Sequence, residues 1–144
     1  QVFYNRTIAV PIARGVTRPA VVRGARRFVD VGCASCHTTT QRSGPDEVEG
    51  LADQTFHPFT DLLLHDMGPN LADGVRQGDA AGNEWRTAPL WGLRFRRFYM
   101  HDGRTQSLDQ AIRMHGGEAS FSRDRYTGMP QPDRDALVNY IGNL

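Results

Sequence analysis

The sequence contains no lysine, so its 17 basic residues are all arginine. They are balanced by 16 acidic residues, and the formal net charge is only +1. This balance argues against a dedicated nucleic-acid-binding protein, whose phosphate contacts need a large cationic surplus. The sequence also lacks any apolar run that approaches the ~18 residues of a membrane-spanning helix. The composition therefore leaves a globular protein that neither binds nucleic acid nor spans a membrane.

An initiating methionine is lacking as well, because the chain begins at Gln1. We take the sequence as a processed or excised product whose targeting segment has been removed. Residues 1–18 carry three arginines and no acidic residue, and Pro11 weakens the case for a strand over residues 8–13. We therefore expect an extended N-terminal arm, or the remnant of a linker, over residues 1–18. Residues 19–144 have the size of one domain.

Cysteine is scarce, and the two that occur, Cys33 and Cys36, belong to the motif Cys-Ala-Ser-Cys-His. This is the signature of covalent c-type haem attachment. Two thiols three positions apart can bond both vinyl groups of one porphyrin edge, and the adjacent His37 then becomes the proximal iron ligand. A thioredoxin-like pair would need a βαβ context, a zinc site would need a second Cys/His pair, and so short a disulfide loop stabilises little. Because bacteria attach such haems outside the cytoplasm, we expect a periplasmic or extracellular protein.

Amphipathic helices are expected near both ends of this domain. Apolar residues recur at helical spacing over residues 19–29, and again over residues 132–141 behind an acidic first turn. Residues 38–58 and 68–89 are rich in polar residues, glycine and proline, which indicates long loops. The two helices resemble the crossed terminal helices of cytochrome c domains. The expected fold is mainly α: a cytochrome c-like domain with crossed N- and C-terminal helices and long haem-wrapping loops.

Two more helices are expected between these ends. Residues 60–65 form a brief helix whose first residues, Thr and Asp, are good caps. A better-defined helix lies within residues 105–117, where Ser107 and Gln110 form a capping box and a Gly-Gly pair ends the helix. Its periodicity places His115 on the buried face of the last turn.

A haem iron has a second axial position, and seven side chains are candidates for it: Met67, Met100, Met114, Met129, His65, His101 and His115. The usual single-haem pattern would select Met129, although little chain is left there to cross the haem face. Helical periodicity favours His115 instead. A core histidine that is hydrogen-bonded to the backbone fits the same periodicity. The residues alone therefore leave the choice open.

Four further segments carry a family resemblance: FTDLLLHDMG (59–68), RTAPLWGL (86–93), HDGR (101–104) and LDQAI (108–112). Together, and in this order, they resemble the C-terminal haem domain of the di-haem cytochrome c peroxidase superfamily. The resemblance runs from about Val2 to Leu144. The segments TDLLLHDMG, EWRTAPLWGL and HGGEA are closer still to the di-haem oxidoreductase branch, whose members are also called thiol oxidoreductases.

The resemblance implies a ligand set. In the peroxidases the distal ligand of this haem is a Met shortly after the Leu-x-x-Ala-Ile motif, and in tryptophylquinone-forming relatives a Tyr takes this place. The position matches His115, which implies a bis-His haem with His37 and His115 as the metal ligands. Met129 would then be a packing residue. His65 and His101 would lie close to the haem and orient loops.

The resemblance also implies partners. The family works with two haems, and this chain resembles only the electron-feeding half, so a second haem domain or another redox protein is the expected partner. The neighbourhood of Thr87 and Pro89 matches a segment that helps to hold calcium between domains, which makes calcium a further candidate cofactor. The cluster at residues 94–99 mixes arginines with aromatic residues. It is either a patch for haem propionates or an electron partner, or a strand with inward aromatics.

We therefore expect an electron-transfer c-type cytochrome module with one covalent, bis-His haem and no catalysis of its own, since no open iron position remains. Two alternatives stay open. The chain could be a fragment or subunit of a di-haem peroxidase-like oxidoreductase. It could also be an accessory cytochrome subunit of a larger respiratory or photosynthetic complex, docked through residues 1–18.

Overall fold

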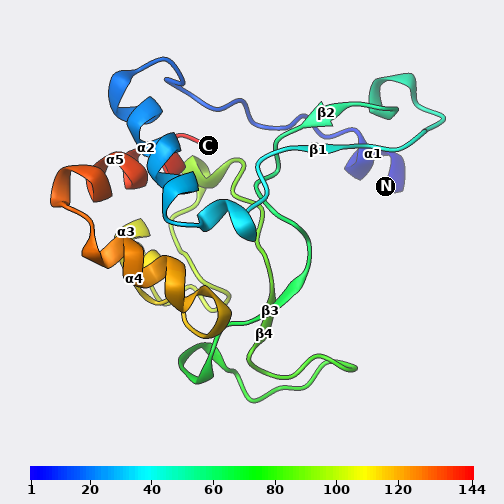
Figure 1. The fold of residues 1–144 in the computed structure, drawn as a ribbon. Helices are drawn as coiled ribbons and strands as arrows, with labels where there is room; N and C mark the ends of the chain where they lie inside the picture. Colours follow the sequence, from blue (N-terminus) through cyan, green and yellow to red (C-terminus); the bar gives the residue numbers. More distant parts are fainter.

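A computed structural model describes residues 1–144, and Figure 1 shows its helices and strands. The α-helices are α1 (Val2–Arg6), α2 (Pro19–Asp30), α3 (Leu108–Arg113), α4 (Ser120–Gly128) and α5 (Gln131–Ile141). The strands are β1 (Gln41–Arg42), β2 (Thr55–Phe56), β3 (Leu64–Asp66) and β4 (Glu84–Arg86). The chain also contains five short 3₁₀ turns: η1 (Cys33–Ser35), η2 (Glu49–Leu51), η3 (Pro69–Leu71), η4 (Leu93–Phe95) and η5 (Gly117–Ala119). None of the helices combines the length and apolar character that crossing a bilayer requires.

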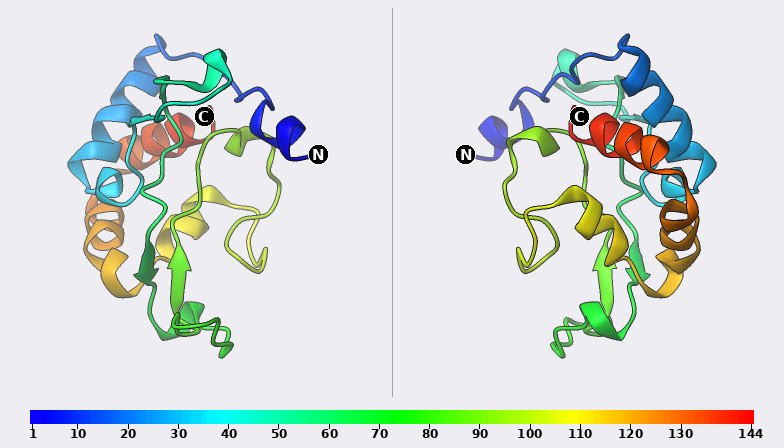
Figure 2. Two further views of the ribbon diagram at one scale, coloured as in Figure 1. Left: turned by 90° about the vertical axis from the view of Figure 1, so that its right-hand side faces the viewer. Right: turned by 90° about the vertical axis from the view of Figure 1, so that its left-hand side faces the viewer.

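Helices α2 and α5 pack against each other at one side of the molecule, with α4 beside them (Figures 1 and 2). Pro19 occupies the first turn of α2, where its missing N–H costs nothing. Gly24 is buried at the contact, and a Cβ atom there would lie 2.0 Å from the Ala136 carbonyl oxygen. Glycine is therefore what allows the two helices to approach so closely.

The core extends from this helix pair to the segment after η1. Phe28 is almost fully buried, and its ring packs edge-on against Phe59 and Tyr140, with ring centroids 6.1 and 5.6 Å apart. Tyr126 and Leu137 are completely buried beside it. Burial of these large apolar side chains is the main stabilising contribution to such a domain.

An ion pair also joins the two helices. Asp133 of α5 accepts hydrogen bonds from Arg23 and Arg27 of α2, each at 2.7 Å. These guanidinium groups lower the pKa of the Asp133 carboxyl. Because its pKa is depressed in the folded chain, the carboxylate stabilises the fold above its unfolded-state pKa. That contribution disappears as the pH falls through the folded-state pKa.

We expect Asp133→Asn to lower the free energy of unfolding at neutral pH, because Arg23 loses its charged partner and Arg27 keeps only Asp30. The difference from wild type should vanish in acid, where the wild-type carboxyl is protonated. Urea unfolding at several pH values measures this. Asp135→Asn, on the exposed side of the same helix, where the carboxylate accepts only from Gln131, is the matched control. A deficit that persists unchanged at low pH would show that the charge of Asp133 is not what matters.

The expectation of a mainly α, cytochrome c-like fold is wrong. The chain is 40% helical and 10% strand, with two small antiparallel sheets, and is therefore mixed. Strand β1 pairs with β2, and β3 with β4, so that His65 lies opposite Trp85. These strands are two or three residues long. Such short strands leave no alternation in the sequence from which they could be read.

The brief helix expected over residues 60–65 is also absent. The Thr60 and Asp61 side chains do accept bonds from backbone N–H groups, those of Leu62 and Leu63, as caps would. However, they close turns instead of starting a helix, because Leu62 has a left-handed backbone (φ 64°). The chain then continues directly into β3.

Residues 1–18 contain the short helix α1, which no signal in the sequence indicated, followed by a stretch without regular structure. Arg6 of α1 pairs with Asp46. Further along, Arg94 donates to the Ile12 carbonyl, and the Arg14 N–H donates to the Asn143 carbonyl at 2.9 Å. These contacts hold the segment across the surface between the C-terminus and η4 (Figure 2).

Candidate haem site

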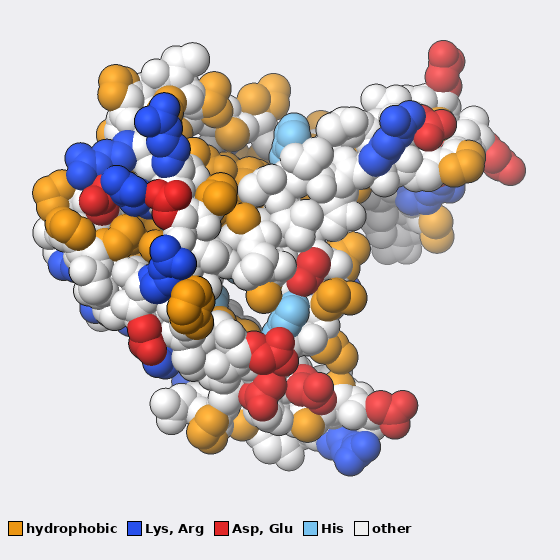
Figure 3. All heavy atoms as spheres, viewed as in Figure 1, with side chains coloured by type: hydrophobic (Ala, Val, Ile, Leu, Met, Phe, Trp, Pro, Cys, Tyr) orange, Lys and Arg blue, Asp and Glu red, His pale blue; other side chains and the backbone are white.

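A cavity of about 440 Å³, lined mostly by apolar side chains, lies between η1, the β3–β4 sheet, α3 and α5. Its size is that of a pocket for a small molecule or cofactor. The four residues predicted to attach and ligate the haem all line this cavity: Cys33, Cys36, His37 and His115. The face of the molecule in Figure 3 is hollowed, with histidine and acidic side chains at the edge of the hollow.

The two cysteines lie on the turn that follows α2. Gly32 has a left-handed backbone (φ 92°), which only glycine adopts easily, and it turns the chain into η1. In a 3₁₀ turn residues three apart lie on one side, so Cys33 and Cys36 face the cavity together. Both are free thiols. Burial raises the pKa of Cys33 to about 11, and burial together with Asp61 raises the pKa of Cys36, so both are protonated at neutral pH.

His37 is anchored through one ring nitrogen. Its Nδ1 lies 3.0 Å from the Phe59 carbonyl oxygen, which can only accept, so Nδ1 carries the proton. The Phe28 ring packs against the imidazole, with centroids 6.4 Å apart. Burial lowers the pKa of His37 to about 4, the Phe59 bond opposes this, and nearby His115 lowers it further. The ring is therefore neutral at neutral pH, and its Nε2 keeps the lone pair that a metal needs.

His115 is anchored in the same way at the end of α3. The Ser107 side chain caps α3 by accepting from the Gln110 N–H, as the sequence predicts. The helix ends at Arg113, and the His115 Nδ1 donates back to the Ala111 carbonyl at 2.8 Å. Burial lowers the pKa of His115, so this ring is also neutral with Nε2 free. This hydrogen bond from Nδ1 to the backbone is the one expected of a structural core histidine. It also orients the ring so that Nε2 can ligate a metal.

The segment that carries His115 is fixed from α4. Arg123 donates to the His115 carbonyl at 3.0 Å. The hydroxyl of buried Tyr126 donates to the Asp109 carboxylate at 2.5 Å, and that carboxylate also pairs with Arg113. Together these bonds hold both ends of α3 against α4.

The other axial candidates divide into two groups. Met67, Met100, His65 and His101 also line the cavity, whereas Met114 and Met129 do not. Met129 packs against the hydrophobic core instead. The His101 ring stacks on Trp85, with ring centroids 3.7 Å apart and planes 13° from parallel, and the Trp85 N–H donates to the Leu71 carbonyl. The stack occupies one face of the His101 ring and was not foreseen from the sequence.

Basic side chains reach the cavity from three segments: Arg86, Arg96 and Arg123 line it. The mixed cluster at residues 94–99 contributes Arg96 together with Phe98 and Tyr99. Guanidinium groups at the edge of an apolar cavity suit the two carboxylates of a haem. Thiols, free imidazole Nε2 atoms, an apolar lining and arginines make a donor set that fits this cofactor.

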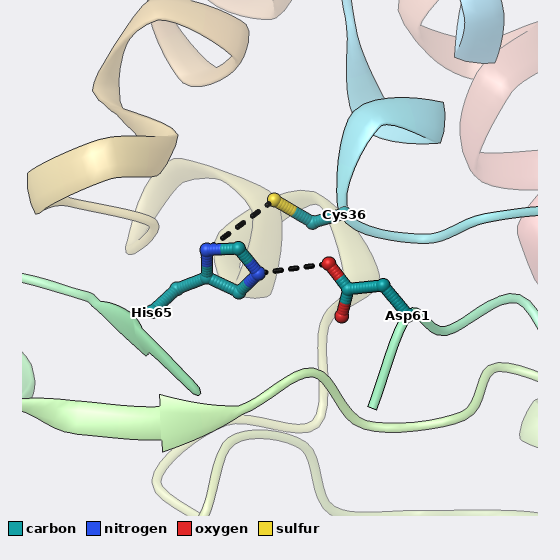
Figure 4. Close-up of side chains that lie close together, drawn as sticks. All are labelled: Cys36, Asp61 and His65. Carbon is teal, nitrogen blue, oxygen red and sulfur yellow. Dashed lines mark hydrogen bonds and ion pairs between the residues drawn. The ribbon is translucent and has the colours of Figure 1, made fainter. Parts of the chain in front are cut away.

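His65 lies at the cavity beside Cys36 and was expected to orient a loop. Figure 4 shows it between Cys36 and Asp61. Its Nε2 lies 2.9 Å from the Asp61 carboxylate, its Nδ1 lies 2.8 Å from that of Glu118 and 3.9 Å from the Cys36 sulfur. One ligand atom from each of Cys36, Asp61 and His65 falls within 4.8 Å of the others. Asp61 and His65 are four residues apart, but no local spacing in the sequence connects them to Cys36, which lies in another segment.

Calcium at the segment of Thr87 and Pro89 stays a prediction of the family resemblance. The Thr87 carbonyl already accepts the Thr60 hydroxyl at 2.7 Å.

Comparisons with known proteins concern the family and the fold of the chain. The sequence model of the family described as "Di-haem oxidoreductase, putative peroxidase" matches residues 1–144. No curated protein matches the chain. Among solved structures, hydrazine synthase of Kuenenia stuttgartiensis, pressurised with xenon, is similar at 22% identity and a TM-score of 0.56. That match covers 94% of this chain but 50% of the other, so this chain spans half its length, and at such identity the likeness concerns the fold alone. Since the family match includes every residue, the chain belongs to the di-haem oxidoreductase family and is a haem-containing redox protein.

Proposed function

We propose that the chain is an electron-transfer module that carries one haem, joined covalently to Cys33 and Cys36 and ligated on its two faces by His37 and His115. One observation carries the proposal. Two neutral imidazoles line one cavity with both thiols, and each has its Nδ1–H tied to a backbone carbonyl. Each Nε2 is thereby left as the ligating atom, which is the usual orientation of a metal-bound histidine.

The bound haem would supply one-electron chemistry, and the chain supplies binding, orientation and electrostatics. Cys33 and Cys36 would tether the porphyrin by adding across its vinyl groups. The backbone bonds of His37 and His115 hold both imidazoles in one orientation, so that ligation need not change between oxidation states. If His37 and His115 both held the iron, no open position would remain for peroxide. We place such a protein in the periplasm or outside the cell, where covalent haem attachment occurs.

A redox partner would meet the module at the cluster of residues 94–99. Phe95 and Phe98 of this cluster are 67% and 58% exposed, among arginines, and Arg96 and Phe98 also line the cavity. Exposed aromatic and arginine side chains are typical of protein interfaces. Such a patch is complementary to the acidic surface of a transient partner protein.

One observation favours a second candidate function. The family is di-haem, yet the chain has a single Cys-x-x-Cys-His motif and spans half of the hydrazine synthase chain. The chain would then be the electron-feeding part of an oxidoreductase whose catalytic haem lies on another domain or subunit. The two candidates differ in what the isolated chain does with peroxide.

The test is the chain produced in a host that attaches c-type haem in its periplasm. We expect an intact mass larger than the polypeptide by one haem, a six-coordinate low-spin spectrum, no spectral change with peroxide, and only slow binding of carbon monoxide to the reduced chain. Cys33→Ser together with Cys36→Ser should abolish the covalent mass increase, whereas Ser35→Ala, between the two thiols, should keep it. A high-spin haem that reacts with peroxide would support the second candidate instead.

A further inference from the structure

His65 differs from the other cavity histidines because both of its ring nitrogens face carboxylates. Nε2 is 2.9 Å from Asp61, and Nδ1 is 2.8 Å from Glu118 (Figure 4 shows the Asp61 side). Carboxylates can only accept, so both nitrogens donate and the ring is the imidazolium. Its side chain is 17% exposed, that of Asp61 14% and that of Glu118 57%. A cation is thus held between two anions at the cavity wall.

The two carboxylates belong to the two segments that hold the proposed axial ligands. Asp61 comes two residues after Phe59, whose carbonyl accepts from His37, and its other oxygen accepts from the Leu63 N–H. Glu118 comes three residues after His115, and its second oxygen accepts from the Asp66 N–H at 3.0 Å. The His65 imidazolium therefore connects the His37 side of the cavity to the His115 side.

The contact between these sides is close. The turn after His115 lies directly on the end of β3: a Cβ atom at Gly117 would be 2.1 Å from the Asp66 carbonyl oxygen, and one at Gly116 would be 2.7 Å from that of Met67. Gly117 also has a left-handed backbone (φ 52°), so a side chain is disfavoured there on two grounds. Gly116 and Gly117 have no side chains that could pack against β3. The Glu118 carboxylate therefore provides the polar connection across this junction.

A metal ion is the competing interpretation of Cys36, Asp61 and His65. A bound metal would need a lone pair on one His65 nitrogen, but both nitrogens carry protons toward carboxylates. It would also need the Cys36 thiolate, whereas the proposed function uses this thiol for the thioether. Electrostatic pairing explains the cluster without a metal.

We propose that His65 is a positioning residue: acting through Asp61 and Glu118, it holds the His115 segment against the His37 side of the cavity and keeps the distal position closed. The inference rests on the proposed function, since it concerns the two ligands named there. The groups that face His65 are Asp61, Glu118 and Cys36, with Asp66 next to it on β3. Glu118 first and Asp61 second raise its pKa, so the imidazolium persists to a higher pH than in an isolated histidine, and the connection weakens as the pH rises through that raised value.

The experiment measures how fast carbon monoxide binds to the reduced, haem-loaded chain, because binding requires His115 to leave the iron. Glu118→Gln removes the charge of an exposed side chain at constant size, and we expect about tenfold faster binding, within the range for residues that orient metal ligands. His65→Gln should act similarly and abolish the rise of the rate with pH that wild type shows. Glu47→Gln, another exposed glutamate without a side-chain partner, should match wild type.

The outcomes separate the two proposals. If carbon monoxide binds slowly to wild type, and equally slowly to the variants at every pH, the role of His65 is overturned and the ligation by His115 stays intact. Wild type that binds carbon monoxide as fast as an open haem would overturn both proposals. If His65→Gln fails to fold, Glu118→Gln decides, since its altered side chain is largely in solvent.

Discussion

His115→Ala is expected to convert a six-coordinate low-spin haem into a high-spin haem that binds carbon monoxide and reacts with peroxide. The alanine side chain cannot reach the iron, so the distal position opens. If dissociation of His115 from the iron costs about 3 kcal/mol, the binding of carbon monoxide is slowed roughly 100-fold. We therefore expect carbon monoxide to bind the variant at least about 100-fold faster than wild type. Optical spectra and stopped-flow mixing with the reduced protein measure both effects.

The substitution should affect ligation far more than folding. The bonds that fix this segment from outside, from Arg123 to the His115 carbonyl and from Glu118 to β3, involve no atom of the imidazole. The lost Nδ1–H bond to the Ala111 carbonyl is worth about 1 kcal/mol. The alanine variant should therefore still fold and retain its covalent haem.

His57→Ala is the matched control, since His57 is exposed and bonds only to Thr39 and Thr40. It should leave the spectrum and the binding rate unchanged. A low-spin spectrum that survives in His115→Ala would show that another side chain is the distal ligand. The cavity then offers Met67 and Met100 as the next candidates, and a sulfur–iron absorption band would identify them.

The helices near both ends and the N-cap of α3 could be predicted because their signals are local. Pro19 does start α2, and Ser107 does cap α3. The Gln110 side chain, however, accepts from the Thr105 hydroxyl, and this hydroxyl in turn accepts from the Ser107 N–H. The capping box therefore closes through a third residue. Local spacing indicates that a cap exists but not which side chains complete it.

What could not be predicted depends on segments that are far apart in the chain. Strands β3 and β4 are three residues each and are stabilised by pairing with each other, so neither has a pattern of its own. The His65 bridge joins residues 53 positions apart. The family resemblance places His65 near the haem, but only the fold brings Glu118 to it. The sequence pattern thus predicted a chemical role for single residues, while their connections needed the tertiary structure.

Gly24→Ala is expected to cost more stability than the same substitution at Gly128, the other glycine within an α-helix. The new Cβ would lie 2.0 Å from the Ala136 carbonyl oxygen and 2.6 Å from the Tyr140 Cβ. One of these is backbone and the other starts a packed side chain, so α2 and α5 must move apart. Overpacking of this kind costs about 1–3 kcal/mol or more, which outweighs the gain of about 0.5–1 kcal/mol from replacing a helical glycine.

The displacement should reach the haem cavity, because Phe28 of α2 and Leu137 and Ile141 of α5 line it. We expect a net loss of about 2 kcal/mol in the free energy of unfolding by urea, together with weaker ligation by His37, which packs on Phe28. Gly128→Ala, at the end of α4 with nothing within 4 Å of the new atom, should change stability by no more than about 0.5 kcal/mol. Equal stability of the two variants would mean that the helices do not meet at Gly24, and the close α2–α5 contact on which the proximal side of the site rests would have to be abandoned.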